Sequence, residues 1–195
     1  MNGTNGTKGM NGLTALVTGG GSGIGLATAK LLANQGANIV LVGRQLAVLN
    51  DAAKSLNVPA ERVYCITGDV SSEGYANKMI LDTKKRFGAI NILVNCAGAF
   101  RGGRIGQQSE EDFDYVCDIN LKGTWFMCKF AARDMLENGS EGGAIVNVAS
   151  TMGKRSRDGV LGCAYAAAKG GVIALTNALA AELAPKVRVN CVVPG

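Results

Sequence analysis

The chain has 195 residues, of which 47% are hydrophobic and 18% charged, a balance that excludes a disordered segment and suffices for a sizeable core. The net charge is +5, but the basic residues are scattered along the chain, so nucleic-acid binding is not expected. No apolar run approaches the roughly 18 residues of a membrane span, and the polar start lacks signal-peptide features, so we expect a cytoplasmic protein without membrane contact.

The six cysteines lie far apart, mostly in apolar segments, and form no Cys-x-x-Cys pair. Because the chain has no histidine, no metal site is expected. The cysteines are interpreted as reduced, buried, small hydrophobic residues. They are Cys65, Cys96, Cys117, Cys128, Cys163 and Cys191.

Residues 1–12 contain an Asn/Gly/Thr repeat of low complexity. Such a segment cannot bury apolar surface, so a flexible tail is predicted there. Residues 13–195 are predicted to form a single domain.

Short β-branched runs alternate with helical patterns from Leu13 onward. Six strands are predicted, at Ala15–Val17, Ile39–Val42, Val63–Ile66, Ile90–Val94, Ala144–Val148 and Val187–Val193. They are apolar without alternation, which indicates burial on both faces and, with right-handed crossovers, a parallel sheet between helices. The fold class is therefore α/β, a doubly wound, Rossmann-like sheet of about six strands.

Apolar residues also recur at helical spacing between the strands, and the faces they form are expected to pack on the sheet. These faces are Ile24, Ala27 and Leu31, then Leu121, Trp125, Cys128 and Ala132, and last Val172, Leu175, Leu179 and Leu183.

A glycine-rich turn follows the first predicted strand and opens a helix at about Gly23. Its glycines let the backbone approach a pyrophosphate, and the helix start supplies free N–H groups. Such a turn can also be a plain tight connection, but its place after the first strand favours a nucleotide site. The candidate cofactor contacts are Thr18, Gly19, Gly21, Ser22, Gly23, Ile24 and Gly25.

Cofactor choice is predicted from the end of the second strand, where NAD enzymes usually present a carboxylate to the ribose. Here the positions hold Gly43 and Arg44, and the next acidic residue is Asp51. The Arg44 guanidinium can bind a 2′-phosphate, so NADP is preferred and NAD is the alternative. Packing of Arg44 on the adenine face alone is the other explanation.

Tyr165 and Lys169 stand four residues apart in a predicted helix, so they share one face. A free tyrosine has a pKa near ~10 and is a poor base unless nearby positive charge favours the phenolate, which Lys169 can provide. Tyr165 can then exchange a proton with a carbonyl or alcohol while a hydride moves. Ser150, after the fifth strand, can hold the same substrate oxygen. Singly, each residue has an ordinary structural explanation; together they favour catalysis.

These motifs resemble the short-chain dehydrogenase/reductase family, whose Thr-Gly-x-x-x-Gly-x-Gly motif reads here from Thr18 to Gly25, and the resemblance extends through nearly the whole chain. It implies catalytic roles for Asn120, Ser150, Tyr165 and Lys169. Asn120 would hold a proton-relay water, and Lys169 would also bind the nicotinamide ribose. The other cofactor contacts that it implies are Asp69, Val70, Asn95, Ala97, Gly98, Tyr165, Pro194 and Gly195.

Two of these contacts have simpler explanations, because Asp69 could cap the next helix and Gly98 could serve a turn. Cys96 replaces the second asparagine of the family's Asn-Asn-Ala-Gly motif. The resemblance also implies further segments after Gly195, including a substrate lid, a helix and a last strand. We therefore expect a chain without the family's C-terminal part, in which Val187–Val193 becomes an apolar sheet edge.

The expected function is an NADP(H)-dependent oxidoreductase that interconverts a small-molecule carbonyl and a secondary alcohol. The alternative is a nonenzymatic, truncated dinucleotide-binding sensor or scaffold. The family resemblance also implies a homodimer or homotetramer through helices 121–135 and 165–184. Substrate identity stays open: five basic residues expected at the active-site mouth would suit an acidic substrate or merely a solvated surface. They are Arg101, Arg104, Lys154, Arg155 and Arg157.

Overall fold

The structure is a computed structural model that describes residues 9–138, 142–155, 159 and 161–195. Most of the predicted tail (residues 1–8) and Arg157 therefore lie outside the described residues. Within the described part of the tail, the backbone N–H of Met10 donates to the Gln35 carbonyl at 2.7 Å. The chain is thus already held against the fold at Met10.

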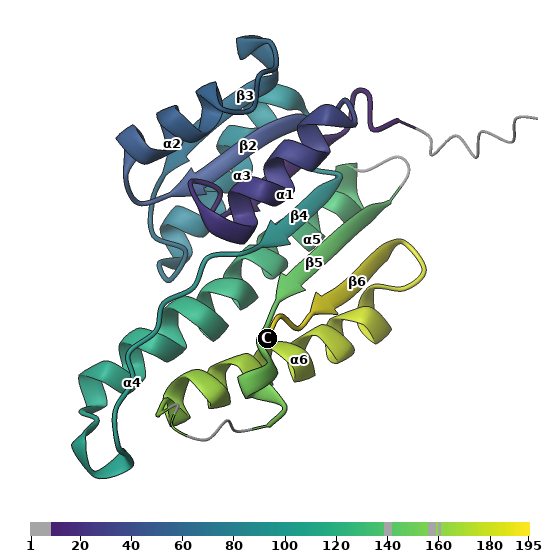
Figure 1. Cartoon of the computed structure of the whole chain (residues 1–195). Coiled ribbons are helices and arrows are strands. Elements are labelled where there is room, and N and C mark those ends of the chain that lie inside the picture. Colours follow the sequence, from purple (N-terminus) through teal and green to yellow (C-terminus); the bar gives the residue numbers. More distant parts are fainter. Residues whose placement is uncertain (1–8, 139–141, 156–158, 160) are drawn as a thin grey trace, which may run out of the picture.

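Six strands form one parallel sheet in the order β3-β2-β1-β4-β5-β6, as predicted (Figure 1). Each observed strand begins and ends within two residues of its predicted bounds. The strands are β1 Thr14–Thr18, β2 Asn38–Gly43, β3 Val63–Thr67, β4 Ile92–Asn95, β5 Gly143–Val148 and β6 Val187–Val192. The doubly wound, Rossmann-like fold class is confirmed.

Helices connect consecutive strands as crossovers. They are α1 Gly23–Asn34, α2 Leu46–Lys54, α3 Glu73–Phe87, α4 Glu110–Cys117, α5 Gly123–Asn138 and α6 Cys163–Leu183. A π-helical turn, Asp118–Lys122, joins α4 to α5, and short 3-10 turns lie at Ala60–Arg62, Ile105–Gln107 and Thr151–Gly153.

The inner strands supply two separate cores because successive side chains of a strand point to opposite faces. Ala15 and Val17 of β1 are fully buried in the core that contains residues of α1 and α2. Leu16, between them, is buried in the other core, with residues of α3 and α5. Both faces of β1 and β2 are therefore covered, as their apolar sequences predict.

The predicted packing face of α1 is wrong. Ile24 and Leu31 are 51% and 69% exposed, whereas Gly25, Ala29 and Ala33 are buried against the sheet. Small residues on that face let the helix backbone lie close to β1, because Gly25 leaves no side chain between the helix and Gly19. The face of α5 is partly wrong as well: Cys128 and Ala132 are buried, but Trp125 is 43% exposed.

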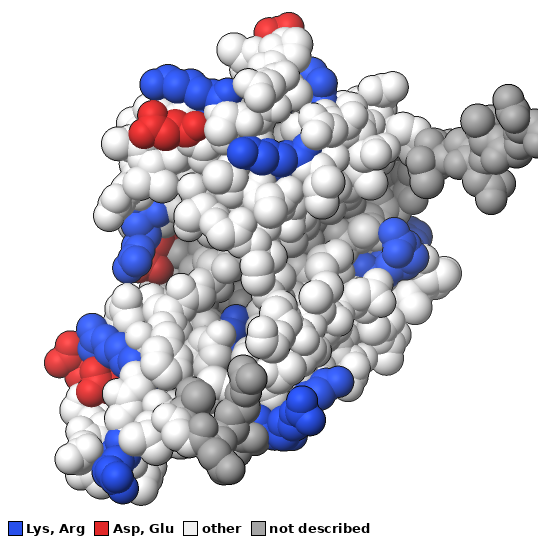
Figure 2. Space-filling view, viewed as in Figure 1, with Lys and Arg blue, Asp and Glu red and all other residues white. Residues whose placement is uncertain are grey.

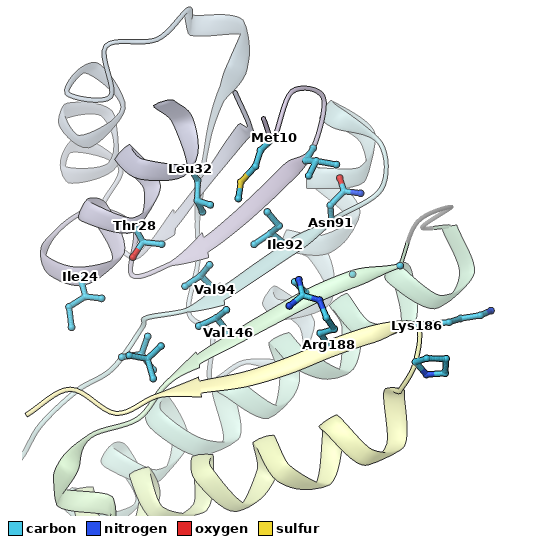
Figure 3. Close-up of a pocket in the computed structure, with 17 residues that line it drawn as sticks. Met10, Ile24, Thr28, Leu32, Asn91, Ile92, Val94, Val146, Lys186 and Arg188 are labelled. Carbon is cyan, nitrogen blue, oxygen red and sulfur yellow. The ribbon is translucent and has the colours of Figure 1, made fainter. Parts of the chain in front are cut away.

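Burial on both faces fails for the outer half of the sheet. On the side of α1, strands β4 to β6 border an apolar groove of about 750 Å³, here called the sheet groove (Figure 3). Its apolar lining includes Leu32, Ile92, Val94, Val146 and Val192. β6 is the edge strand, and its exposed side chains include Arg188 and Asn190, so this edge is less apolar than predicted.

Acidic and basic side chains are scattered over the visible face, with no single basic stripe (Figure 2). Within the described ranges, no helix is both long and apolar enough to cross a bilayer.

Candidate functional site

The strand order reverses between β1 and β4, because the chain passes from β3 at one edge back to the middle of the sheet. In doubly wound sheets a crevice opens at the carboxyl ends of the two strands at such a reversal. Gly19, directly after β1, has φ +64°, and a Cβ there would lie 2.9 Å from the Ala97 backbone nitrogen after β4. Only glycine lets these two strand ends meet so closely.

A cleft of about 380 Å³ lies at this reversal. It brings together ten of the predicted cofactor contacts from four strand ends and the start of α1. They are Gly19, Ser22, Gly23, Ile24, Gly25, Arg44, Asp69, Val70, Ala97 and Gly98. The first turn of α1 thus borders the cleft with its free N–H groups.

Three predicted contacts lie behind the cleft wall instead. The Thr18 hydroxyl accepts hydrogen bonds from the backbone N–H groups of Cys96 and Ala97, both at 3.1 Å, and so joins the ends of β1 and β4. Asn95 is buried, and its amide donates to Asn147 Oδ1 at 2.9 Å. Gly21 packs under Val48 of α2. Among the described contacts, these residues shape the cleft without lining it.

Asp69 does not cap α3, whose N-cap residue is Ser72. One oxygen of its carboxylate, Oδ1, accepts hydrogen bonds from the Ser71 N–H at 2.9 Å and the Ser71 hydroxyl at 2.7 Å. These bonds fix the carboxylate in the cleft wall, where it can accept a hydrogen bond from a ligand.

Arg44 follows β2 and lines the same cleft. Its Nη1 donates to the Tyr115 hydroxyl of α4 at 3.4 Å, and the guanidinium forms no ion pair with any described residue. A positive charge without a carboxylate partner is free to bind an anionic group of a ligand.

Tyr165 and Lys169 face each other in the first two turns of α6, with Lys169 Nζ 5.7 Å from the centre of the Tyr165 ring. Lys169 is only 5% exposed. Its Nζ donates to the Val148 carbonyl at the end of β5, at 2.8 Å. Desolvation lowers the pKa of Lys169 to about 8, and nearby Cys96 and Cys191 oppose this shift.

Asn120 is fully buried in the π-helical turn before α5. Its Nδ2 donates to the carbonyls of Ala99 at 2.7 Å and Val116 at 2.8 Å, whereas its Oδ1 has no partner among the described residues. That oxygen points toward Gly98, where an added Cβ would lie 2.8 Å from Asn120 Oδ1 and 3.6 Å from Lys169 Nζ. The side-chain-free Gly98 therefore leaves room for a water between an orphaned acceptor and an ammonium group.

Ser150 follows β5 and begins a short 3-10 turn, where its Oγ accepts from the Met152 N–H at 3.2 Å. The hydroxyl proton is therefore available for another acceptor. Pro194 lies beside this turn, because its carbonyl accepts from the Thr151 N–H at 2.8 Å, and Gly195 packs near the same threonine. Ser150, Pro194 and Gly195 thus meet at the carboxyl ends of β5 and β6.

Five basic residues were expected at the active-site mouth, and the four of them that the structure describes do not line the cleft. Arg101 turns toward α4, where its guanidinium stacks 3.9 Å from the Tyr115 ring centre and pairs with Asp112 at 2.9 Å. Lys154 and Arg155 are exposed, and Arg157 lies outside the described residues. The charge of Arg101 is therefore already balanced.

Five residues that line the cleft were not among the predicted contacts: Val42, Gly43, Gly68, Cys96 and Ile119. Gly68 could have been found from the sequence, because it is a glycine directly after a predicted strand. In the structure an added Cβ there would lie 2.6 Å from Met79. The cysteines are also less buried than predicted: only Cys128 is buried, and Cys163 is exposed. Burial raises the pKa of the Cys96 thiol to about 11, so it stays protonated.

Comparisons with known proteins agree with this geometry. Residues 13–195 match the family described as short chain dehydrogenase. Carbonyl reductase family member 4 of Danio rerio is 40% identical over 182 residues, which cover 93% of this chain and 74% of that protein. A 3-oxoacyl-(acyl-carrier-protein) reductase of Chlamydia trachomatis is 36% identical over 184 residues, 93% of this chain and 73% of that protein.

Solved structures are similar in fold and sequence. A short-chain dehydrogenase/reductase from Brucella melitensis superimposes with a TM-score of 0.87 at 37% identity, over 95% of this chain and 75% of that one. A structure of actinorhodin polyketide ketoreductase with NADPH gives a TM-score of 0.87 at 35% identity, over 94% and 70% of the two chains. The present chain thus spans about three quarters of the length of these proteins.

Proposed function

Because this chain belongs to the short-chain dehydrogenase family, we propose that it is an NADP(H)-dependent oxidoreductase that interconverts a carbonyl and a secondary alcohol. Tyr165 is its general acid/base. The observation that carries this proposal is the buried ammonium of Lys169, 5.7 Å from the Tyr165 ring at the end of a nucleotide-sized cleft. Burying a cation costs free energy, and ionisable residues with a strongly shifted pKa that lie in a cleft are commonly functional.

The residues around the cleft fit a dinucleotide. The α1 N-terminus with Gly19 and Gly23 would hold the pyrophosphate, Asp69 and Val70 the adenine, and Lys169 the nicotinamide ribose. When bound, NADPH supplies the hydride for the carbonyl carbon. The end of the cleft formed by Ala97 and Gly98 lies next to Lys169, as this role requires.

The chain's own residues would manage the proton. Ser150 donates a hydrogen bond to the substrate oxygen, and Tyr165 gives that oxygen its proton. The Lys169 cation stabilises the phenolate left behind. A water at Asn120 Oδ1 would then pass a proton inward, since this buried oxygen lacks a partner within the described part of the chain.

Replacing Tyr165 by Phe tests the acid/base role. Since general acid catalysis contributes about 100-fold or more, we expect kcat for a ketone substrate to fall by at least that factor. The dissociation constant for NADPH, measured by its fluorescence, should change little. Tyr75→Phe, an exposed tyrosine on α3, is the matched control. Undiminished turnover by Tyr165→Phe would refute the role, and NADPH binding without turnover in the unaltered chain would favour the sensor.

Arg44 supports the preference for NADP over NAD, because its unpaired guanidinium can hold a 2′-phosphate. Loss of a charged hydrogen bond costs about 1.5–3 kcal/mol, so Arg44→Ser should lower kcat/KM for NADPH about 10- to 100-fold. The value for NADH should hardly change. Arg104→Ser serves as the exposed-arginine control. Equal losses with both cofactors would contradict the assignment.

We also propose a homodimer or homotetramer. Trp125 and Leu136 on α5 are 43% and 40% exposed, which is unusual for such large apolar side chains on one helix. Sedimentation of the chain over a range of concentrations tests this, and a monomer throughout would contradict it.

A further inference from the structure

Large apolar side chains gather around Tyr165 although they are exposed to solvent. The Phe100 ring meets the Tyr165 ring edge-on, with centres 5.3 Å apart and planes at 79°. Phe100 is 53% exposed, Leu161 48% and Ile105 79%. Exposed apolar clusters of this kind commonly mark a binding surface.

Ile105 and Leu161 line a pocket of about 280 Å³, here called the apolar pocket. It is lined by Gly103, Ile105, Met152, Leu161, Gly162, Cys163 and Ala166. Tyr165 itself does not line this pocket, but the Phe100 ring lies against both Tyr165 and the lining residue Gly162. The pocket is therefore about one side chain away from the proposed acid/base.

The pocket walls come from two segments that are tied together. The Gly103 N–H donates to the Leu161 carbonyl at 3.2 Å. A Cβ on Gly102 would lie 2.6 Å from the same carbonyl oxygen, so the segments approach as closely as glycine permits. Phe100 also lies against Gly162, where an added Cβ would be 2.8 Å from its ring. The pocket is therefore formed without a ligand.

The lining offers little to a charged or polar group. Among the described lining residues Cys163 has the only polar side chain, and that thiol donates to Gln108 Oε1 at 2.8 Å. Arg101 is paired with Asp112, and the exposed Arg104 follows the lining residue Gly103 without lining the pocket itself. A cavity of about 150 Å³ suffices for benzene, so the volume here accommodates a phenyl ring.

We propose that the carbonyl substrate of this site carries a compact apolar group, such as a phenyl ring, which occupies the apolar pocket beside Tyr165. This inference rests on the proposed function and adds the substrate class to it. The described lining residues carry no charged side chain, so the charge of an acyl carrier would gain nothing from the pocket itself.

The first test compares two esters with the same reacting group, ethyl 4-phenylacetoacetate and ethyl acetoacetate, with acetoacetyl-coenzyme A as the charged substrate. An apolar contact changes specificity about 10- to 200-fold, so kcat/KM should be at least about 10-fold higher for the phenyl ester. Equal values, or a preference for the coenzyme A ester, would overturn the inference.

Two variants test whether the apolar pocket causes the preference for the phenyl ester. Leu161→Ser should reduce the preference for the phenyl ester at least about fivefold, since it removes an apolar wall. Ile105→Ser, at a more exposed position, should act in the same direction with little risk to folding. Leu81→Ser on α3 is the matched control, because Leu81 is 45% exposed and lies away from the pocket. An unchanged preference in both pocket variants would place the phenyl group elsewhere.

A second readout needs no turnover. Cys163 lines the pocket and is exposed, whereas burial raises the pKa of Cys96 and Cys128 to about 11 and about 12 and slows their alkylation. The phenyl ester at saturation should slow iodoacetamide alkylation of Cys163 at least about fivefold, and ethyl acetoacetate far less, as peptide mass spectrometry can measure. Cys163→Ser identifies the labelled peptide. Protection of Cys163 without turnover would contradict the proposed function but support binding in the apolar pocket. Turnover of the phenyl ester without protection would support the proposed function but contradict binding in the apolar pocket.

Discussion

Lys169 combines deep burial with a charge that the proposed chemistry needs. Only 5% of it is exposed, and its one hydrogen bond to protein in the described structure goes to the Val148 carbonyl. No carboxylate lies beside it to offset desolvation, which is why its pKa falls to about 8. A buried lysine of this kind opposes folding, because the unfolded chain holds the proton more tightly than the folded one.

We therefore expect Lys169→Met to stabilise the fold while abolishing activity. A pKa lowered from 10.5 to about 8 corresponds to about 3 kcal/mol, so the free energy of unfolding at pH 7 should rise by about 1–3 kcal/mol after the lost hydrogen bond is allowed for. Urea unfolding measures this. Lys85→Met, at a side chain that is 80% exposed, should have little effect.

The pH dependence gives an independent check. Between about pH 8 and pH 10.5 the unfolded chain binds more protons at Lys169 than the folded chain, so this residue makes stability rise with pH in that window. The stability gain of Lys169→Met should accordingly shrink from pH 8 upward and be lost above 10.5. If the stability gain of Lys169→Met is constant with pH, or if this variant is less stable than the unaltered chain at pH 7, the electrostatic explanation is contradicted.

At the scale of elements, a buried chain of polar side chains ties β4, β5 and α6 together. Asn95 of β4 donates to Asn147 Oδ1 of β5 at 2.9 Å, and Asn147 Nδ2 donates to the Thr176 hydroxyl of α6 at 3.0 Å. Thr176 in turn donates to the Val172 carbonyl at 2.7 Å. Because α6 carries Tyr165 and Lys169, these hydrogen bonds fix the helix of the proposed catalytic pair against β4, whose end borders the cleft, and against β5.

Asn147→Ala should therefore lower the free energy of unfolding by about 2–4 kcal/mol, since it leaves a cavity and removes a partner from both Asn95 and Thr176. Thermal unfolding followed by circular dichroism measures the loss. Asn190→Ala is the control, because Asn190 lies on the neighbouring strand β6 with its side chain exposed. Similar melting temperatures for the two variants would mean that the polar chain contributes little.

This polar chain also shows where prediction from the sequence ends. The six strands could be predicted because each is a short apolar run, and the Tyr165–Lys169 pair because helical spacing places both on one face. The hydrogen bond between Asn147 and Thr176 could not be predicted, since a single polar residue within an apolar run has no periodicity that reveals its partner. The packing face of α1 was mispredicted for a related reason: Gly25 and Ala29 are small, and hydrophobicity alone favours the larger Ile24 and Leu31.

At the scale of the whole molecule, the sheet is covered unequally. Helices α3, α5 and α6 pack along one side of it, while α1 and α2 cover mainly β1 to β3 on the other (Figure 1). The sheet groove occupies the remaining area on the α1 side, and Figure 3 shows Ile92, Val94 and Val146 directed into it. Val94 is only 4% exposed, but Ile92 and Val146 are partly buried and Val192 is 52% exposed, so the described structure leaves part of an apolar sheet face open to water.

Such a face should bind an apolar dye. We expect the folded 195-residue chain to enhance the fluorescence of anilinonaphthalene sulfonate, because contiguous apolar patches larger than a few hundred Å² are rare on soluble monomers. Val192→Lys, which places a charge at a position in the groove that is 52% exposed, should reduce the enhancement. Leu81→Lys on α3 removes a similarly exposed apolar side chain outside the groove and should reduce it less. Because Lys186 and Arg188 already border the groove, raising the salt concentration should weaken the binding of this anionic dye only partly. Equal effects of the two substitutions would show that the dye reports general surface rather than the uncovered face of β4 to β6.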